Sequence, residues 1–232
     1  MKQKVKNSGL LGDMPNMNNA VRIIKLWNDC RQVKTSFPLV LARHFFYKLH
    51  KKNIVSSNKV TIYGLKNIHT KGLLKIGMSY IGFMNCHDRT FLNIKGKIEF
   101  RDNFTIGKGC RFDIGRNAIA IFEGGYVNPN TIFVIMHGIT VGRGCALSWG
   151  CQFIDEDFHS LGYSGESTSD SHKIVIGSHV WIGNNVTVLK GSVIPDGCVV
   201  AGGSVVNTRF HLKNALIAGT PARIIRENIE WE

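Results

Sequence analysis

The chain has 232 residues, a formal net charge of +13 at pH 7 and six cysteines. This length suits one large domain with a modest appendage. The chain lacks a run of about 20 apolar residues, which argues against a membrane-spanning helix, and its N-terminus lacks the apolar core of a secretory signal. We therefore expect a cytoplasmic protein with reduced thiols.

The positive charge is concentrated near the N-terminus. Residues 1–52 are rich in Lys and Arg and poor in Asp and Glu. Such a charge favours an anionic partner, which could be a phosphate cofactor, an acidic glycan or a membrane face, although a solvated basic surface explains it equally well. Because no nucleic-acid recognition motif accompanies the charge, we expect no nucleic-acid partner.

Residues 1–52 are predicted to form a basic helical cap. The spacing of the apolar residues predicts one short amphipathic helix that contains Val21, Ile24, Leu26 and Trp27. Pro38 separates it from a second helical stretch, residues 39–49, which is rich in Phe and Tyr. The pair would cover one end of the following domain, or it would contact a membrane surface or a partner.

Residues 53–206 form the second predicted unit, in which apolar residues recur at intervals of six. The interval is strict at the C-terminal end, in the row Ile176, Ile182, Val188, Ile194, Val200 and Val206. Two shorter rows precede it: Phe100, Ile106 and Phe112, then Val141, Leu147 and Phe153. This period fits neither a helix nor an alternating strand. It indicates a β-helix with three hexads per coil and one apolar side chain per hexad at the axis.

The corners of such a coil accept only small or compact side chains. The fourth residue after most apolar positions is small or compact, and at four of these positions it is a cysteine: Cys110, Cys145, Cys151 and Cys198. Burial as small apolar residues accounts for these cysteines, so we expect neither disulfides nor a cysteine metal site.

The period breaks between Phe153 and Ile176, a gap of 23 residues. Residues 155–173 are polar and rich in Ser and Gly, which predicts a loop inserted into the coil. Loops on rigid scaffolds are where functional sites are usually built. After Val206 the period ends, and residues 207–232 are predicted to form an extended segment and then a short helix that contains Ile224, Ile225 and Ile229.

Two segments resemble a known family. Residues 174–206, which read IVIGSHVWIGNNVTVLKGSVIPDGCVVAGGSVV, resemble the hexapeptide-repeat acyltransferases, in the branch of the sugar and polysaccharide O-acetyltransferases that includes the galactoside, maltose and capsule enzymes. Residues 218–226, AGTPARIIR, resemble the closing motif of that family. The resemblance implies an all-β fold, a left-handed parallel β-helix of hexapeptide repeats with a short helical N-terminal cap and a C-terminal extension. It also implies a homotrimer.

The same resemblance implies a chemistry: transfer of an acetyl group from acetyl-CoA to a hydroxyl of a sugar or bacterial surface polysaccharide, with no metal required. The general base of the family matches His159, in the segment IDEDFHSLGY, and its ring would be oriented by Asp157 rather than by Asp155 or Glu156. The family's active-site Asn matches Asn128, with Asn130 as the neighbouring candidate. Trp181 of VWIG would form a wall of the acceptor or pantetheine site.

The resemblance also implies a set of residues that contact the cofactor. These positions are Trp181, Asn184, Gly202, Gly203, Asn207, Thr208, Arg223 and Arg226. The two glycines would expose backbone to the pantetheine amides, and the two arginines would meet the CoA phosphates.

Other readings stay open. His172 and His179 compete with His159 for the role of base. A metal hydratase of the gamma carbonic anhydrase type uses the same coil and would need several converging histidines, for which His137 is a further candidate. A non-catalytic trimeric assembly module would need none of this chemistry, and an amine acceptor is also compatible with the chain.

Overall fold

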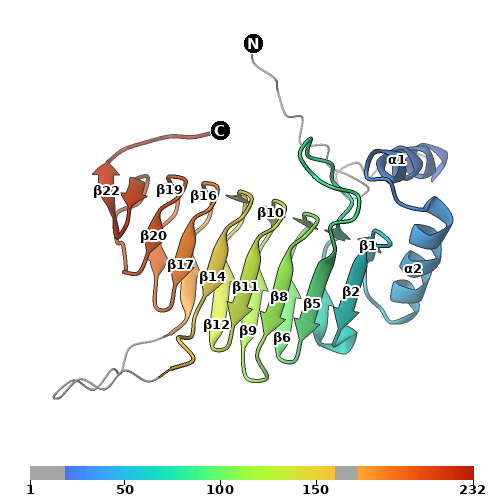
Figure 1. Cartoon of the computed structure of the whole chain (residues 1–232), viewed down its shortest axis with the longest axis horizontal. Coiled ribbons are helices and arrows are strands. Elements are labelled where there is room, and N and C mark those ends of the chain that lie inside the picture. Colours follow the sequence, from blue (N-terminus) through green and yellow to red (C-terminus); the bar gives the residue numbers. More distant parts are fainter. Residues whose placement is uncertain (1–18, 160–171) are drawn as a thin grey trace, which may run out of the picture.

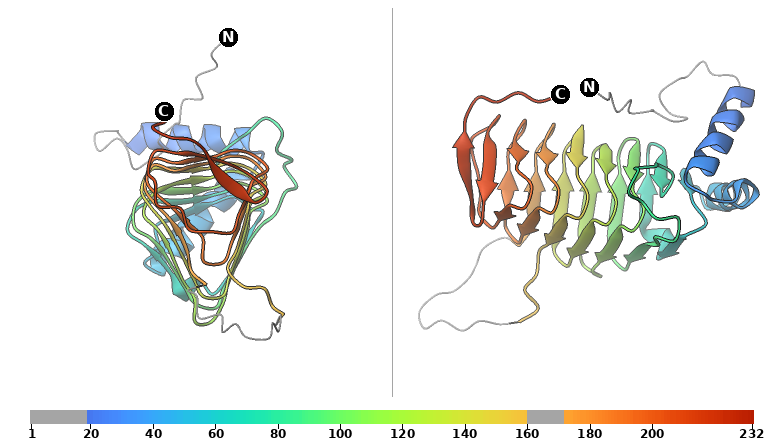
Figure 2. Two further views of the ribbon diagram at one scale, coloured as in Figure 1. Left: turned by 90° about the vertical axis from the view of Figure 1, so that its left-hand side faces the viewer. Right: turned by 45° about the horizontal axis from the view of Figure 1, so that its top comes forward.

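The computed structural model describes residues 19–159 and 172–232, most of which wind into a coil of parallel strands (Figure 1). Seen along its axis the coil is triangular, with one sheet on each side (Figure 2). Neighbouring strands within each sheet are parallel, because each coil hydrogen-bonds the coils before and after it. The exception is the final pair, β21 and β22, which is antiparallel.

The strands of sheet A are, in spatial order, β1 (Ile54–Ser56), β4 (Leu74–Ile76), β7 (Phe104–Ile106), β10 (Gly125–Val127), β13 (Cys145–Leu147), β16 (Trp181–Ile182), β19 (Val199–Val200), β21 (Leu216–Gly219) and β22 (Ala222–Arg226). Sheet B contains β2 (Val60–Tyr63), β5 (Thr90–Ile94), β8 (Arg111–Ile114), β11 (Ile132–Ile135), β14 (Gln152–Ile154), β17 (Thr187–Leu189) and β20 (Val205–Val206). Sheet C contains β3 (Ile68–Thr70), β6 (Lys97–Phe100), β9 (Ile119–Phe122), β12 (Gly138–Val141), β15 (Ile174–Ile176) and β18 (Val193–Ile194). A short 3-10 turn, η1 (Leu65–Asn67), precedes β3.

The six-residue rows form the core, as predicted. All apolar residues of the strict row, from Ile176 to Val206, are at most 1% exposed. In sheet B the inward residue is a phenylalanine in three successive coils, and the rings stack: Phe112 on Phe133 at 4.4 Å between ring centroids, and Phe133 on Phe153 at 4.6 Å. Each coil therefore buries its apolar side chains against the next one, and several coils are needed for a stable core.

The four corner cysteines are buried, as predicted, and all six cysteines are free thiols. Cys151 Sγ lies 3.1 Å from the carbonyl oxygen of Gly183 in the next coil. Burial raises the pKa of Cys110 to about 12 and that of Cys151 to about 11. Since the thiolate is the reactive form, these cysteines are structural rather than nucleophilic.

Two helices cover the first end of the coil: α1 (Asn19–Gln32) and α2 (Phe37–Leu49) (Figure 1). They pack through a small apolar cluster that contains Leu26, Cys30, Val33, Val40, Val55, Leu73 and Met78. Pro38 lies in the first turn of α2 and not between the helices as predicted, because the missing N–H of proline costs nothing there. Neither helix of the described residues is long and apolar enough to cross a membrane.

The predicted C-terminal helix is wrong. Residues 222–226 form β22, which pairs antiparallel with β21 after a turn at Thr220 and Pro221. β21 in turn adds to the edge of β19. Ile224 and Ile225 are β-branched and favour a strand, and the hairpin covers backbone groups that the last coil would otherwise leave unpaired.

A second interruption of the coil was not predicted. Residues 77–89 separate β4 from β5 and contribute Phe83, whose ring meets Trp149 edge to face at 5.5 Å between centroids. Trp149 lies in the turn between β13 and β14, so this loop crosses several coils along the edge where sheet A meets sheet B.

Candidate active site

The predicted loop leaves the coil between β14 and β15, at the vertex where sheet B meets sheet C (Figure 2). Residues 155–159 and 172–173 of this loop are described, and 160–171 lie outside the described residues. Asp155 begins it and is fully buried. Its carboxylate accepts three backbone N–H bonds, from Met136 at 2.6 Å, His137 at 2.8 Å and Gly138 at 2.7 Å. Asp155 therefore fixes the root of the loop to the preceding coil and is not free to orient a catalytic histidine.

We expect Asp155→Ala to lower the free energy of unfolding by about 3 kcal/mol, because it leaves buried N–H donors without an acceptor. For a chain of this length that corresponds to a fall in Tm of roughly 6–12 °C, measurable by differential scanning calorimetry. Asp157→Ala is the matched control, since the Asp157 side chain is exposed, and should change Tm little. A wild-type Tm for Asp155→Ala would contradict the anchoring role.

Three side chains that could bind a metal converge at the same vertex. His137 Nε2 lies 2.7 Å from Glu156 Oε2, and the His137 and His172 rings lie 4.3 Å apart between centroids. One ligand atom from each of His137, Glu156 and His172 falls within 4.8 Å of the others. The hydrogen bond from His137 holds the pKa of Glu156 below its usual value. Glu156 and His172 come from the two ends of the loop and His137 from the turn beneath it, so the group also ties the loop to the coil.

Asp157 and His159 extend beyond this anchored root. Asp157 forms an ion pair with Lys190 of the following coil, at 2.7 Å between Oδ2 and Nζ, and this contact raises the pKa of Lys190. His159 is exposed and stands at the limit of the described part of the loop. Asp155 and Glu156 are held at the root of the loop, whereas Asp157 is exposed and pairs with a partly exposed lysine, so Asp157 is the acid of the three that can turn toward His159.

Trp181 lies on the outer face of sheet A, which is the side of the triangle opposite the loop vertex. Its Nε1 donates to Ser148 Oγ at 3.2 Å, and its ring lies 6.1 Å from that of Trp231. Trp231 stacks on His179 at 4.2 Å and donates to the His179 carbonyl oxygen. His179 is thus occupied by the C-terminal segment, which weakens it as a competitor for the role of base.

Sequence reasoning missed the other aromatic residues on or beside sheet A. Trp149 and Trp181 are both about 40% exposed, and Phe83 contacts the former. Only four tryptophans occur in the chain, and three of them, Trp149, Trp181 and Trp231, gather on or beside sheet A. Exposed aromatic rings on a rigid sheet suit an apolar or sugar-like ligand face. No local pattern in the sequence links Trp149 or Trp231 to Trp181, because both are distant from it along the chain.

The structure distinguishes Asn128 from Asn130. Both lie in the turn from β10 to β11, at the edge shared by sheets A and B. Asn130 has a left-handed backbone, with φ of 61°, and its Oδ1 lies directly against Gly109, where a Cβ would be only 2.0 Å away. This packing gives Asn130 a structural role in the corner. Asn128 is partly exposed, and its hydrogen bonds to other described residues are made by its backbone, so no described residue occupies its side-chain amide.

The residues predicted to contact the cofactor do not form one cluster in the single chain. Asn184, Gly202 and Gly203 lie together along the edge between sheets A and B, where Gly203 N donates to the Asn184 carbonyl oxygen at 2.9 Å. Asn207 and Thr208 follow β20, on the edge that carries the loop, and are exposed. Arg223 and Arg226 belong to β22 at the far end of sheet A, also exposed.

Comparisons with known proteins give the following relatives. The chain is 42% identical over 214 residues to a 24.8 kDa protein of the cps region of Klebsiella pneumoniae, which covers 91% of this chain and 96% of that protein. It is 32% identical over 164 residues to WbbJ of Escherichia coli K12, named as an O-acetyl transferase of lipopolysaccharide biosynthesis, which covers 65% of this chain and 83% of WbbJ. No protein-family model matches the chain.

Among solved structures, that of the polysialic acid O-acetyltransferase OatWY superposes with a TM-score of 0.52 at 21% identity, over 78% of this chain and 84% of that one. This likeness confirms the predicted fold class, the left-handed parallel β-helix of hexapeptide repeats.

Proposed function

The chain belongs to the family of hexapeptide-repeat O-acetyltransferases, and from this membership we propose that it transfers the acetyl group of acetyl-CoA to a hydroxyl of a bacterial surface polysaccharide or its sugar precursor. One observation links the proposed reaction to particular residues. The loop between β14 and β15 is anchored by Asp155 to the coil and carries an exposed histidine, His159, two residues after an acid.

The chemistry is a direct transfer. His159 accepts the proton of the acceptor hydroxyl as the oxygen attacks the thioester carbonyl, and Asp157 holds the imidazole in position. A C–O bond forms and the C–S bond breaks. The proton passes from His159 to the departing CoA thiolate, so no acyl-enzyme is needed. The transient oxyanion requires an N–H donor, for which the free amide of Asn128 is the proposed source.

We infer that the enzyme is a homotrimer, because one chain does not bring the proposed parts together. His159 extends from the vertex between sheets B and C, whereas Trp181 lies on sheet A, across the core from that vertex (Figure 2). A neighbouring copy can place its sheet A against this vertex. When each copy offers both surfaces, repetition of that contact closes a ring. Each site then takes its base from one subunit and its aromatic wall from the next.

The proposed contacts with acetyl-CoA begin at the edge that sheets A and B share. Asn184, Gly202 and Gly203 present backbone groups along this edge for the pantetheine amides. Arg223 and Arg226 lie near its end and offer positive charge to the CoA phosphates, while Asn207 and Thr208 line the loop edge of the neighbouring subunit. CoA would thus lie between the β-helices of two neighbouring subunits.

The acceptor is proposed to be an anionic polysaccharide. WbbJ is named for lipopolysaccharide synthesis, the Klebsiella relative lies in a cps region, and this chain has a net charge of +13. A positive surface attracts an acidic glycan and speeds its encounter. We also propose a cytoplasmic location. Six free thiols, most of them buried, are typical of proteins from a reducing compartment.

The test is an acetylation assay with purified protein, acetyl-CoA and a panel of acidic and neutral oligosaccharides, read by mass spectrometry. We expect a mass gain of one acetyl group on a hydroxyl and release of free CoA. The group His137, Glu156 and His172 favours a second function, a metal-dependent hydratase. Activity that survives chelation would support the transferase, whereas stoichiometric zinc or iron with CO2 hydration would support the hydratase. A protein that shows no thermal shift with CoA would be an assembly module instead.

A further inference from the structure

The outer face of α2 is apolar along its whole length. Val40 and Tyr47 point into the fold, and the opposite side of the helix carries exposed apolar residues: Leu39, Leu41, Phe45, Phe46 and Leu49. Phe45 is 66% exposed and Leu49 is 68% exposed. Large apolar side chains that are exposed side by side normally mark an interaction surface, so the outer face of α2 requires a partner.

The neighbouring helix extends the same surface. Leu26 and Cys30 of α1 are buried, as is Val33 just after it, whereas Ile23, Ile24 and Trp27 are about half exposed on an adjacent side of the helix. Arg31 lies over the Trp27 ring at 4.8 Å. We call the exposed apolar residues of both helices the cap face. Both helices lie at one end of the coil, away from the loop of His159 (Figure 1).

The part of the sequence that contains the cap face is rich in Lys and Arg and poor in acids. From Cys30 to His87, 58 residues, the sequence contains ten Lys and Arg and no Asp or Glu. Asp29 is the one acid in the two helices, and burial raises its pKa to about 6. A surface that combines large apolar side chains with Lys and Arg has the composition of a helix that lies in the interface of an anionic bilayer.

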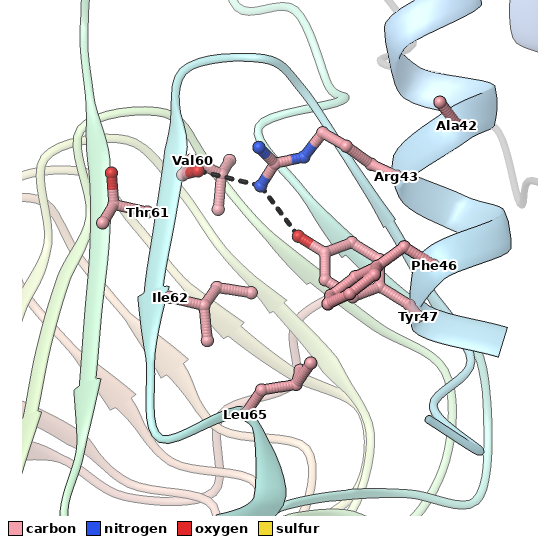
Figure 3. A pocket seen from close by; sticks show the side chains of 8 residues that line it. All are labelled: Ala42, Arg43, Phe46, Tyr47, Val60, Thr61, Ile62 and Leu65. Carbon is pink, nitrogen blue, oxygen red and sulfur yellow. Dashed lines mark hydrogen bonds between the residues drawn. The ribbon is translucent and has the colours of Figure 1, made fainter. Parts of the chain in front are cut away.

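A groove beside α2 also combines apolar walls with a positive charge (Figure 3). It has a volume of about 570 Å³ and lies between α2 and β2, with Phe46, Ile62 and Leu65 among its walls. Arg43 enters it and donates to Tyr47 Oη at 2.7 Å and to the Val60 carbonyl oxygen at 2.9 Å. No ion pair of the described residues involves Arg43, so its charge is available to an anion outside the protein.

We propose that the cap face binds the surface of an anionic lipid bilayer, with the apolar residues of α2 and α1 in the headgroup region and the surrounding Lys and Arg at the lipid phosphates. A second copy of the chain fits less well, because it would bring two surfaces of excess positive charge together. Residues 1–18 contain three Lys and one Asp, so they would add positive charge and not neutralise it. The bilayer satisfies both the apolar and the electrostatic requirement.

The experiment is co-sedimentation of the full chain with vesicles of phosphatidylcholine alone or with about 30% phosphatidylglycerol. We expect binding to the anionic vesicles, weakened when salt rises from 0.1 to 0.5 M. The double variant Phe45→Ser/Leu49→Ser should bind them roughly tenfold more weakly, because two large apolar side chains leave the interface. Ile225→Ser is the matched control, since Ile225 is 62% exposed in β22 at the opposite end of the coil; it should bind as the wild type does.

Equal binding by wild type and the double variant would overturn the proposal, as would failure of the wild type to bind anionic vesicles. Dimerisation that the double variant abolishes, measured by analytical ultracentrifugation without lipid, would assign the cap face to a second copy instead. Circular dichroism verifies that the variants are folded. The proposed membrane binding does not rest on the proposed function. Acetyl transfer to a soluble acceptor should be the same in the double variant and wild type, so the experiments can refute membrane binding and acetyl transfer separately.

Discussion

Replacement of His159 by alanine is expected to lower kcat/KM for acetyl transfer by about 10²- to 10⁴-fold, the range for loss of a general base. Without the imidazole, the acceptor hydroxyl must lose its proton to water as it attacks. The binding of CoA should change little, because most of the proposed donor contacts lie at the edge between sheets A and B and in β22, away from this loop. Steady-state kinetics and a CoA titration measure the two quantities on the same protein.

The matched controls are the two histidines that compete with His159 for the role of base. His179→Ala removes a ring that stacks on Trp231, and His172→Ala removes one that meets His137. Neither should reproduce the loss of activity. Since His159 is exposed, its variant should also keep the Tm of the wild type. If His159→Ala kept full activity, or if His172→Ala were the inactive variant, the base would have to be reassigned.

Mixed trimers of two inactive variants are expected to recover about one third of the wild-type activity. In the proposed ring, His159 and Trp181 of one site come from different subunits. In a trimer that contains both His159→Ala and Trp181→Ala subunits, in either ratio, one of the three interfaces joins an intact His159 to an intact Trp181. Two affinity tags isolate such trimers after co-expression, and each parental homotrimer provides the baseline.

The control for this recovery uses two variants of the same proposed surface, His159→Ala and Asp157→Asn. Their subunits are mixed in the same way. Both residues belong to the same loop, so no interface of their mixed trimers has both intact, and activity should stay at the baseline. A site contained within one chain would give no recovery for the first pair either. That result would refute the shared site while it leaves His159 as the base.

The coil could be predicted from the sequence because its determinants are local. One buried residue per hexad is enough to set the period, and the loop of His159 is visible as a break in the strictest part of that period. The earlier interruption at residues 77–89 was missed because the hexads around it are irregular. A break in the six-residue spacing can be recognised only where the spacing on both sides is regular. The function came from the family resemblance, since the period itself carries no chemistry.

The contacts that distinguish one histidine from another were beyond reach of the sequence. His179 and Trp231 are 52 positions apart and meet only because the C-terminal segment folds back over the last coils. Asp155, Glu156 and Asp157 are neighbours in sequence, yet the coil engages each in a different way: three backbone donors, a histidine and a lysine. Likewise the C-terminal hairpin depends on an open strand edge, which no local pattern reveals.

The regular stacking of the coils fixes how far the active loop stands from the cap. Along sheet B, four steps separate β2 from β14, and at about 4.8 Å for each step the distance is roughly 19 Å. With the cap face on a bilayer, the coil acts as a rigid spacer that holds His159 at a set height. A glycan anchored in the same membrane would then be acetylated at a sugar a given distance from its lipid, and the insertion of one coil would move that position outward by one step.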